Sequence, residues 1–270
     1  MTPPAGTRPY PPAAAGYGTA GGWLTMLRPA GARPGGRMLV FPHAGAGPFA
    51  LTGLAALVPP DVEVLGVTLP GREHRAAEPG TTCARLVDGV EGGLRALPPL
   101  PTAFFGCSVG ALFALLVASR RPALCDHLVV ASQTPGPQPR AALRATGERD
   151  LMRVLQDAGD TPSVILEDPD IRASLLARLE GDLRLGAEAE PEAGTARVAA
   201  PLTVLAGLAD PLVPADRLSD WPRHTTAHCR VVALSGGHFA FLERDHGRMV
   251  RVVLDDVRAE LLGARAAGTG

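Results

Sequence analysis

A serine framed by two glycines is the feature of this sequence best suited to chemistry. Residues 104–112 read F-F-G-C-S-V-G-A-L, with Ser108 in a G-x-S-x-G pattern between an apolar run that predicts a strand and one that predicts a helix. A tight strand-to-helix turn strains the serine backbone and exposes its hydroxyl, and Gly106 and Gly110 let strand and helix approach closely. We therefore predict that Ser108 is a nucleophile rather than a bystander in a glycine-rich turn. Cys107 precedes the apex, should point elsewhere, and is the weaker candidate.

A serine hydroxyl is a weak nucleophile and needs a general base, for which histidine is well suited. His238 stands in a glycine-rich loop directly after a predicted late strand, in the run V-V-A-L-S-G-G-H-F of residues 231–239. Gly236 and Gly237 allow this loop to swing back over the strand ends, so we predict that His238 is the base. Four other histidines follow Ser108 in the chain and are expected to be structural: His127, His224, His228 and His246, the last at the start of the final helix.

The acid that orients this histidine should follow the predicted strand at residues 202–206. Asp210 does so, in the turn G-L-A-D-P-L-V-P of residues 207–214, and its carboxylate would hold the histidine tautomer. Asp216 is the fallback, although a negative charge at a helix N-terminus explains it equally well. The order serine, aspartate, histidine is the one that α/β-hydrolase topology requires.

Acyl transfer also needs hydrogen-bond donors for the oxyanion that forms on the substrate. The run F-P-H-A-G-A-G at residues 41–47 follows the first strong strand and supplies small residues for such a loop. We expect one donor to be the N–H of Val109, after the nucleophile, and the other the N–H of Ala44 or a neighbour. His43 is interpreted as shaping this loop. His43 and Phe239 are also the candidate substrate contacts.

The elements that must position these residues follow an alternating pattern of short apolar runs and helical stretches. Apolar residues recur at helical spacing from Leu86 to Leu97, and residues 111–119 are apolar nearly all round. This alternation predicts an α/β fold with a mostly parallel central sheet flanked by helices. The predicted strands are Met38–Phe41, Val62–Val67, Ala103–Phe105, Leu128–Ala131, Leu202–Ala206 and Val231–Leu234.

Two segments interrupt the pattern. Residues at about 134–200 show helical periodicity without a strong strand signal, and we interpret them as a helical lid insertion over the substrate, with plain packing helices as the alternative. Residues 1–36 are rich in Pro, Gly and Ala and predict a flexible leader. Within it, Trp23, Leu24 and Leu27 are expected to anchor the leader locally rather than form an edge strand. The folded domain is then residues 37–270.

Composition excludes several classes of function. Of 270 residues 46% are hydrophobic, and a formal net charge of −1 argues against nucleic-acid binding through a basic surface. The four cysteines form no C-x-x-C pair, so they predict a reduced, intracellular protein without a cysteine metal site. No apolar run is long enough to span a bilayer. We expect a cytoplasmic protein with no cofactor, no metal and no membrane or nucleic-acid partner.

Taken together, the motifs resemble the type II thioesterases that accompany polyketide and nonribosomal peptide synthases, within the α/β-hydrolase superfamily. The resemblance runs from about Met38 to the C-terminal helix. It departs from the family at Cys107 and Val109, where a His and a Met are common. It rests on F-P-H-A-G at 41–45, L-P-G-R-E at 69–73, the Ser108 elbow, D-P-L-V at 210–213, Trp221 and G-G-H-F at 236–239.

The resemblance implies hydrolysis of acyl thioesters from the phosphopantetheine arm of an acyl or peptidyl carrier protein, and an editing role that removes aberrant acyl groups. Carrier proteins are typically acidic, so Arg72 and Arg75 are candidate docking residues. For Arg72 the favoured interpretation is instead that it braces its own loop through Glu73 or a carbonyl. Two other functions stay open: an esterase or acyltransferase with another acyl substrate, and a catalytically silent module that binds the carrier.

Overall fold

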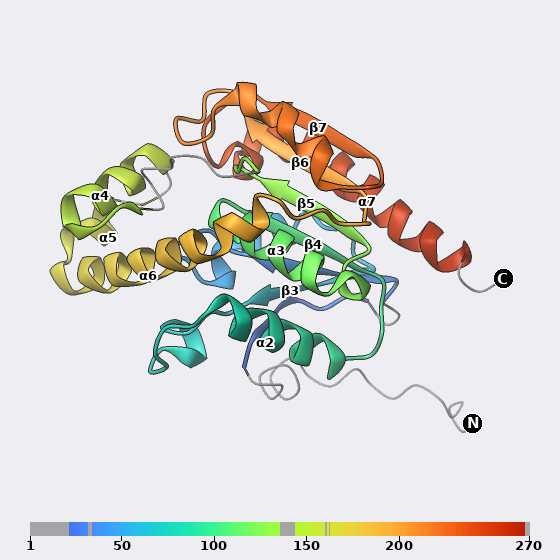
Figure 1. The fold of residues 1–270 in the computed structure, drawn as a ribbon, viewed down its shortest axis with the longest axis horizontal. Helices are drawn as coiled ribbons and strands as arrows, with labels where there is room; N and C mark the ends of the chain where they lie inside the picture. Colours follow the sequence, from blue (N-terminus) through green and yellow to red (C-terminus); the bar gives the residue numbers. More distant parts are fainter. Residues whose placement is uncertain (1–21, 32–33, 136–143, 160, 162, 268–270) are drawn as a thin grey trace, which may run out of the picture.

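The computed structural model describes residues 22–31, 34–135, 144–159, 161 and 163–267. Within these residues, seven strands form one sheet in the order β1-β3-β2-β4-β5-β6-β7 (Figure 1). All neighbouring strands are parallel except β1 and β3, which confirms the predicted mostly parallel sheet. The strands are β1 Leu24–Arg28, β2 Gly36–Phe41, β3 Val62–Val67, β4 Thr102–Cys107, β5 His127–Ala131, β6 Leu202–Gly207 and β7 Cys229–Leu234.

Helices cover both faces of the sheet and enclose two hydrophobic cores. Helices α2 (Cys83–Arg95), α3 (Val109–Arg120) and α6 (Pro169–Ala193) pack on one face, and α1 (Thr52–Ala55) and α7 (Gly247–Ala267) pack on the other. Every residue of the strands from β2 to β6 is buried, which explains their continuous apolar runs. Among the described residues no helix combines the length and the apolar character needed to cross a bilayer.

The edge strand β1 corrects the prediction for the leader. Leu24 to Arg28 pair antiparallel with β3, whereas the sequence favoured a local anchor. Trp23, directly before the strand, packs against α2, since a Cβ on Gly89 of that helix would lie 2.2 Å from its ring. The Arg28 guanidinium donates to four backbone carbonyls, those of Ala55, Val58, Pro59 and Val62. These contacts form only when the chain is folded, so the short sequence of β1 does not by itself indicate a strand. Residues 1–21 of the predicted leader lie outside the described residues.

The insertion between β5 and β6 contains helices α4 (Gly147–Ala158), α5 (Ser163–Glu167) and α6, as the helical periodicity predicts. Figure 1 shows α4, α5 and the first half of α6 gathered at one end of the molecule. The N-terminus of α6 is capped by Asp168, whose carboxylate accepts from the backbone N–H groups of Asp170 and Ile171. Leu185 and Ala189, farther along α6, belong to the same core as α3. One helix therefore packs with α4 and α5 at one end and against α3 farther along. Residues 136–143, 160 and 162 of the insertion lie outside the described residues.

Candidate active site

Ser108 occupies the sharp turn between β4 and α3. Its backbone has φ 53° and ψ −128°, a conformation that non-glycine residues rarely adopt. A Cβ on Gly106 would lie 2.5 Å from the Cα of Ala111, and one on Gly110 would lie 2.2 Å from the carbonyl oxygen of Phe41. Both glycines are therefore required for strand, helix and neighbouring loop to approach this closely.

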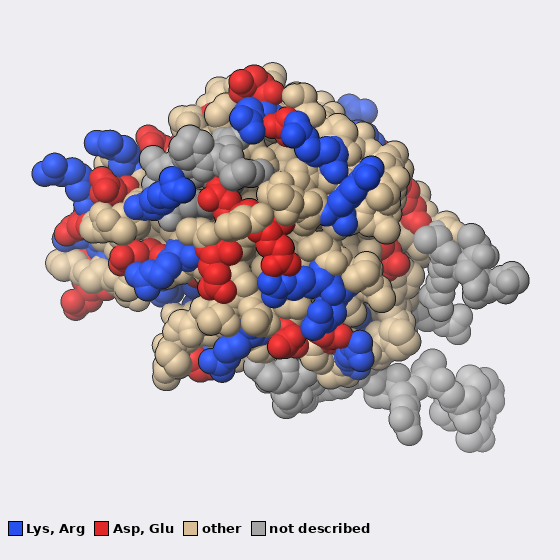
Figure 2. All heavy atoms as spheres, viewed as in Figure 1, with Lys and Arg blue, Asp and Glu red and all other residues tan. Residues whose placement is uncertain are grey.

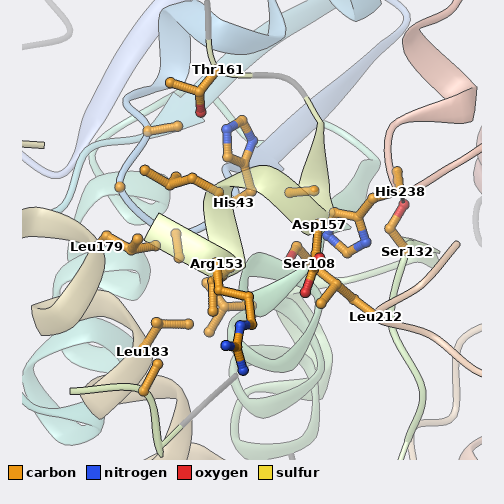
Figure 3. A pocket seen from close by; sticks show the side chains of 18 of the residues that line it. His43, Ser108, Ser132, Arg153, Asp157, Thr161, Leu179, Leu183, Leu212 and His238 are labelled. Atoms are coloured by element: carbon orange, nitrogen blue, oxygen red, sulfur yellow. Dashed lines mark hydrogen bonds between the residues drawn. The ribbon is translucent and has the colours of Figure 1, made fainter. Parts of the chain in front are cut away.

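The predicted acid and base form a buried pair beside this turn. His238 Nδ1 donates to Asp210 Oδ2 at 2.8 Å, and the two side chains are 3% and 0% exposed. The other oxygen of Asp210 accepts from the N–H of Leu212 at 2.8 Å, which fixes the carboxylate plane. Ser108 and His238 line the same cavity (Figure 3). Asp216, the fallback acid, is instead exposed at the start of the 3-10 helix Ala215–His224.

Close packing of two loops brings the acid and the base together. A Cβ on Gly207, at the end of β6, would lie 2.0 Å from the carbonyl oxygen of Gly237. The N–H of Ala209 donates to the Gly236 carbonyl at 2.9 Å, and Gly236 itself has φ +111°. The loop after β7 thus folds back over the end of β6, as its paired glycines predict.

The predicted oxyanion donors lie at the carboxyl ends of the strands, as Ser108 does. Ala44 and Val109 line the cavity with Ser108. Within the described part of the chain, the backbone N–H groups of Ala44 and Val109 have no hydrogen-bond acceptor. The N–H of Gly45 is engaged, because it donates to Asp182 Oδ2 at 2.8 Å. Of these two neighbours in the loop, only Ala44 has an N–H available to a substrate.

The cavity has a volume of about 880 Å³ and is roofed by the insertion. Helix α6 contributes Leu179 and Leu183, and the turn after β6 contributes Leu212 (Figure 3). The lining is mostly apolar, but five charged residues among those that the structure describes also line the cavity: Arg144, Asp150, Arg153, Asp157 and Arg178. No group of three His, Cys, Asp or Glu side chains is arranged to hold a metal ion within the described residues.

Comparison with known proteins decides the family. The Thioesterase domain family matches residues 37–260. The chain belongs to this family. It is 32% identical over 229 residues to the AMB antimetabolite synthetase AmbE of Pseudomonas aeruginosa, a match that covers 80% of this chain and 10% of AmbE. It is 33% identical over 226 residues to a probable cadicidin biosynthesis thioesterase of Streptomyces griseus, which covers 82% of this chain and 62% of that protein.

Both of these relatives are longer than the region matched, since the chain spans less than two thirds of either. Among solved structures, the type II thioesterase BorB from the borrelidin biosynthetic cluster superposes with a TM-score of 0.72 at 25% identity. That match covers 88% of this chain and 97% of BorB. The resemblance to type II thioesterases and the α/β-hydrolase fold are thereby confirmed.

His43 of this thioesterase-family chain contacts the site without entering the acid–base pair. Its ring lies 4.7 Å from that of Phe239, and both residues line the cavity. Burial lowers the pKa of His43 to about 4, with further contributions from the charges of His238 and Arg72. His43 is therefore neutral at pH 7. The Cys107 thiol is fully buried, lies 3.8 Å from His43 Nδ1 and does not line the cavity.

The other four histidines after Ser108 have partners of their own and do not line the cavity. His246 lies in the short 3-10 helix directly before α7, close to where the sequence placed it. The partners are Glu260 and Thr203 for His127, the Ala196 carbonyl for His224, Glu260 for His228, and Ser235 and the Ala240 carbonyl for His246.

Three residues to which the sequence analysis gave no role form hydrogen bonds that hold the residues of the site in place. Ser132, with φ 55°, donates its hydroxyl to the backbone carbonyl of His238. Gln133 Nε2 donates to the Ser108 carbonyl at 3.1 Å, and Trp221 Nε1 donates to the Gln133 carbonyl at 3.0 Å. Ser132 and Gln133 directly follow a predicted strand at the same edge of the sheet as Ser108. That position was the signal that could have revealed them.

The docking role predicted for Arg72 and Arg75 is wrong, because the two residues are only 6% and 3% exposed. Arg72 does brace a loop, through the Ala46 carbonyl at 2.5 Å, but its carboxylate partner is Asp182 of α6 rather than the adjacent Glu73. The local sequence offered only Glu73, whereas the fold brings α6 to Arg72. Arg75 binds the Thr68 carbonyl and Glu78 and stacks on Trp23 at 4.0 Å.

Proposed function

We propose that this chain is a serine hydrolase that releases acyl groups held as thioesters on the phosphopantetheine arm of an acyl or peptidyl carrier protein. The observation that carries the proposal is the buried Asp210–His238 pair beside the strained Ser108 turn, at the foot of an apolar cavity. Membership of the thioesterase family and the likeness to BorB support the thioester as substrate.

In the first half of the reaction, Ser108 Oγ attacks the thioester carbonyl carbon while its proton passes to His238 Nε2. Asp210 holds the proton on Nδ1 and stabilises the imidazolium that forms. The negative charge that develops on the carbonyl oxygen is bound by the N–H groups of Ala44 and Val109. The carbon–sulfur bond then breaks, and His238 returns the proton to the departing pantetheine sulfur.

In the second half, water replaces the thiol. His238 removes a proton from the water, the hydroxyl oxygen attacks the acyl carbon, and the bond to Ser108 Oγ breaks with return of the proton to the serine. The products are a carboxylic acid and the unmodified enzyme. His43 lines the same space but stays neutral at pH 7, since its pKa is lowered to about 4 by burial. It therefore adds no second imidazolium to the site at that pH.

The cavity lining favours a broad choice of acyl group, which fits an editing role. Alkyl side chains such as Leu179, Leu183 and Leu212 discriminate mainly by size. One methylene more or less in such a pocket changes the free energy by only about 1–3 kcal/mol. An enzyme that clears many different aberrant acyl groups needs this tolerance.

A carrier protein must reach the cavity past the insertion, whose surface carries exposed positive charges. Arg149 and Arg153 of α4 and Arg184 of α6 are exposed. Figure 2 shows Arg side chains gathered at this end of the molecule, interspersed with acidic ones. We assign carrier docking to these arginines, in place of the buried Arg72 and Arg75, because an acidic partner is attracted to exposed positive charge.

The test compares hydrolysis of a panel of acyl-loaded carrier proteins by the wild type and by Ser108→Ala, with a matched simple ester as second substrate. We expect carrier thioesters to be turned over faster than the ester, and the substitution to abolish both activities. Turnover of the ester without that of the carrier would favour an esterase. Absence of turnover, together with no labelling of Ser108 by a fluorophosphonate probe, would favour a silent carrier-binding module.

A further inference from the structure

Helix α6 of the insertion is tied to the loop that carries Ala44. Asp182, in the middle of α6, accepts the Gly45 N–H at 2.8 Å and binds both terminal nitrogens of Arg72 at 2.7 and 2.8 Å. Arg72 also donates to the Ala46 carbonyl at 2.5 Å. One buried carboxylate and one buried guanidinium therefore hold the Ala44–Gly45 and Ala46–Gly47 peptide groups of this loop.

Packing around the pair leaves the loop little room to move. Gly45 has φ +79°, and a Cβ there would lie 3.2 Å from Leu175 and 3.5 Å from Leu179 of α6. On the other side, a Cβ on Gly47 would lie 2.0 Å from the carboxylate of Glu73. The loop is thus clamped between α6 and the residues that follow β3.

The geometry points to Asp182 and Arg72 as positioning residues for the oxyanion site, an inference that rests on the proposed function. Because Asp182 accepts the Gly45 N–H, the peptide plane between Ala44 and Gly45 is held in place, which restricts rotation about the Ala44 backbone bonds that set the direction of the Ala44 N–H. The Ala44 N–H is left without an acceptor among the described residues and lines the cavity beside Val109.

The ion pair is suited to this task because a bidentate arginine–carboxylate contact fixes orientation as well as distance. Asp182 also couples two parts of the site. The same helix that contributes Leu175 and Leu179 to the acyl cavity holds the loop that carries Ala44, so a shift of α6 would move acyl pocket and oxyanion donor together. The charge of Arg72 further lowers the pKa of His43 in this loop.

The test measures kcat and KM for Asp182→Asn, Asp182→Ala and Arg72→Lys on an acyl-loaded carrier. Asparagine keeps the shape of Asp182, but its NH₂ group must face a donor in either orientation: Arg72 Nη2 if its oxygen takes the place of Oδ2, or the Gly45 N–H and Arg72 Nη1 if it takes the place of Oδ1. We expect kcat to fall about 10- to 100-fold, with KM changed less than about threefold, because a displaced donor loses most of the rate that a well-placed one supplies.

The matched control is Glu63→Gln, which breaks the buried pair of Arg37 and Glu63 at 2.6 Å. That pair joins the starts of β2 and β3, at the opposite end of the strands from the cavity. We expect a lower melting temperature in the control with kcat unchanged at temperatures well below melting. A purely structural role for Asp182 would give the same result as the control, and an unchanged kcat in folded Asp182→Asn would overturn the inference.

A second readout separates this inference from the proposed function. A fluorophosphonate places developing negative charge on a phosphoryl oxygen when it reacts with Ser108, so its labelling rate reports the same donors without a carrier substrate. If the wild type labels but fails to hydrolyse acyl carriers, the proposed function is wrong while the positioning role is still tested. Slower labelling in Asp182→Asn than in Glu63→Gln would support the positioning role of Asp182, and equal labelling rates would refute that role.

Discussion

Replacing Asp210 by asparagine removes the charge that orients His238 while preserving the size of the side chain. Asp210 has two acceptor duties, one to His238 Nδ1 at 2.8 Å and one to the Leu212 N–H at 2.8 Å. An amide has only one oxygen. If that oxygen stays with Leu212, the amide NH₂ donates to His238 Nδ1, and the imidazole must carry its own proton on Nε2. In this tautomer Nε2 cannot accept the proton of Ser108.

If the amide flips instead, its oxygen restores the productive tautomer, but its NH₂ then faces the N–H of Leu212. A buried donor without an acceptor costs about 1–3 kcal/mol, which leaves roughly one molecule in 5 to one in 150 in the competent arrangement. Loss of the charge-assisted bond to the imidazolium costs about 1.5–3 kcal/mol more. Together these effects predict a fall in kcat of about 100- to 10,000-fold in Asp210→Asn.

The assay is steady-state hydrolysis of an acyl-loaded carrier at pH 7, with thermal melting to confirm that the variant is folded. Asp216→Asn is the matched control, because it removes an exposed carboxylate six positions along the chain, and we expect its kcat to be that of the wild type. A loss below tenfold in folded Asp210→Asn, or an equal loss in Asp216→Asn, would refute the assignment of Asp210.

Two further predictions concern stability and backbone packing. The pKa of His43 is about 4 in the folded protein against 6.5 ordinarily, so between these values the unfolded state binds more protons. The free energy of unfolding should therefore fall by about 2 kcal/mol from pH 7 to pH 5 through this residue. In His43→Gln, the free energy of unfolding measured with urea should not show this fall of about 2 kcal/mol. An identical pH dependence of the free energy of unfolding in the two proteins would contradict a lowered pKa for His43. In Gly110→Ala the new Cβ would lie 2.2 Å from the Phe41 carbonyl and 2.4 Å from that of Pro42, so we expect a loss of about 1–3 kcal/mol and at least tenfold in kcat. Gly92→Ala lies inside α2, where a Cβ meets open space, so it should leave kcat unchanged and raise the stability by about 0.5–1 kcal/mol. Equal melting temperatures and rates for the two variants would show that Gly110 tolerates a side chain.

Much of the fold and of the candidate site could be predicted from the sequence because it depends on local geometry. Strands buried on both faces read as continuous apolar runs whatever their neighbours are. The Ser108 turn needs small residues on either side of the serine, and Gly106 and Gly110 supply them within the same five residues. The carboxyl ends of parallel strands share one edge, so the residues after β4, β6 and β7 had to meet there.

Side-chain partners were decided only by the tertiary structure. Arg72 had an acidic neighbour in Glu73, yet it pairs with Asp182 across 110 positions of sequence. Arg75 looked like a surface charge and is buried under Trp23. Composition and spacing describe what a residue is able to bind, but which partner it finds depends on the helix or strand that the fold brings beside it. A buried charge must be paired, and only the packed chain determines with what.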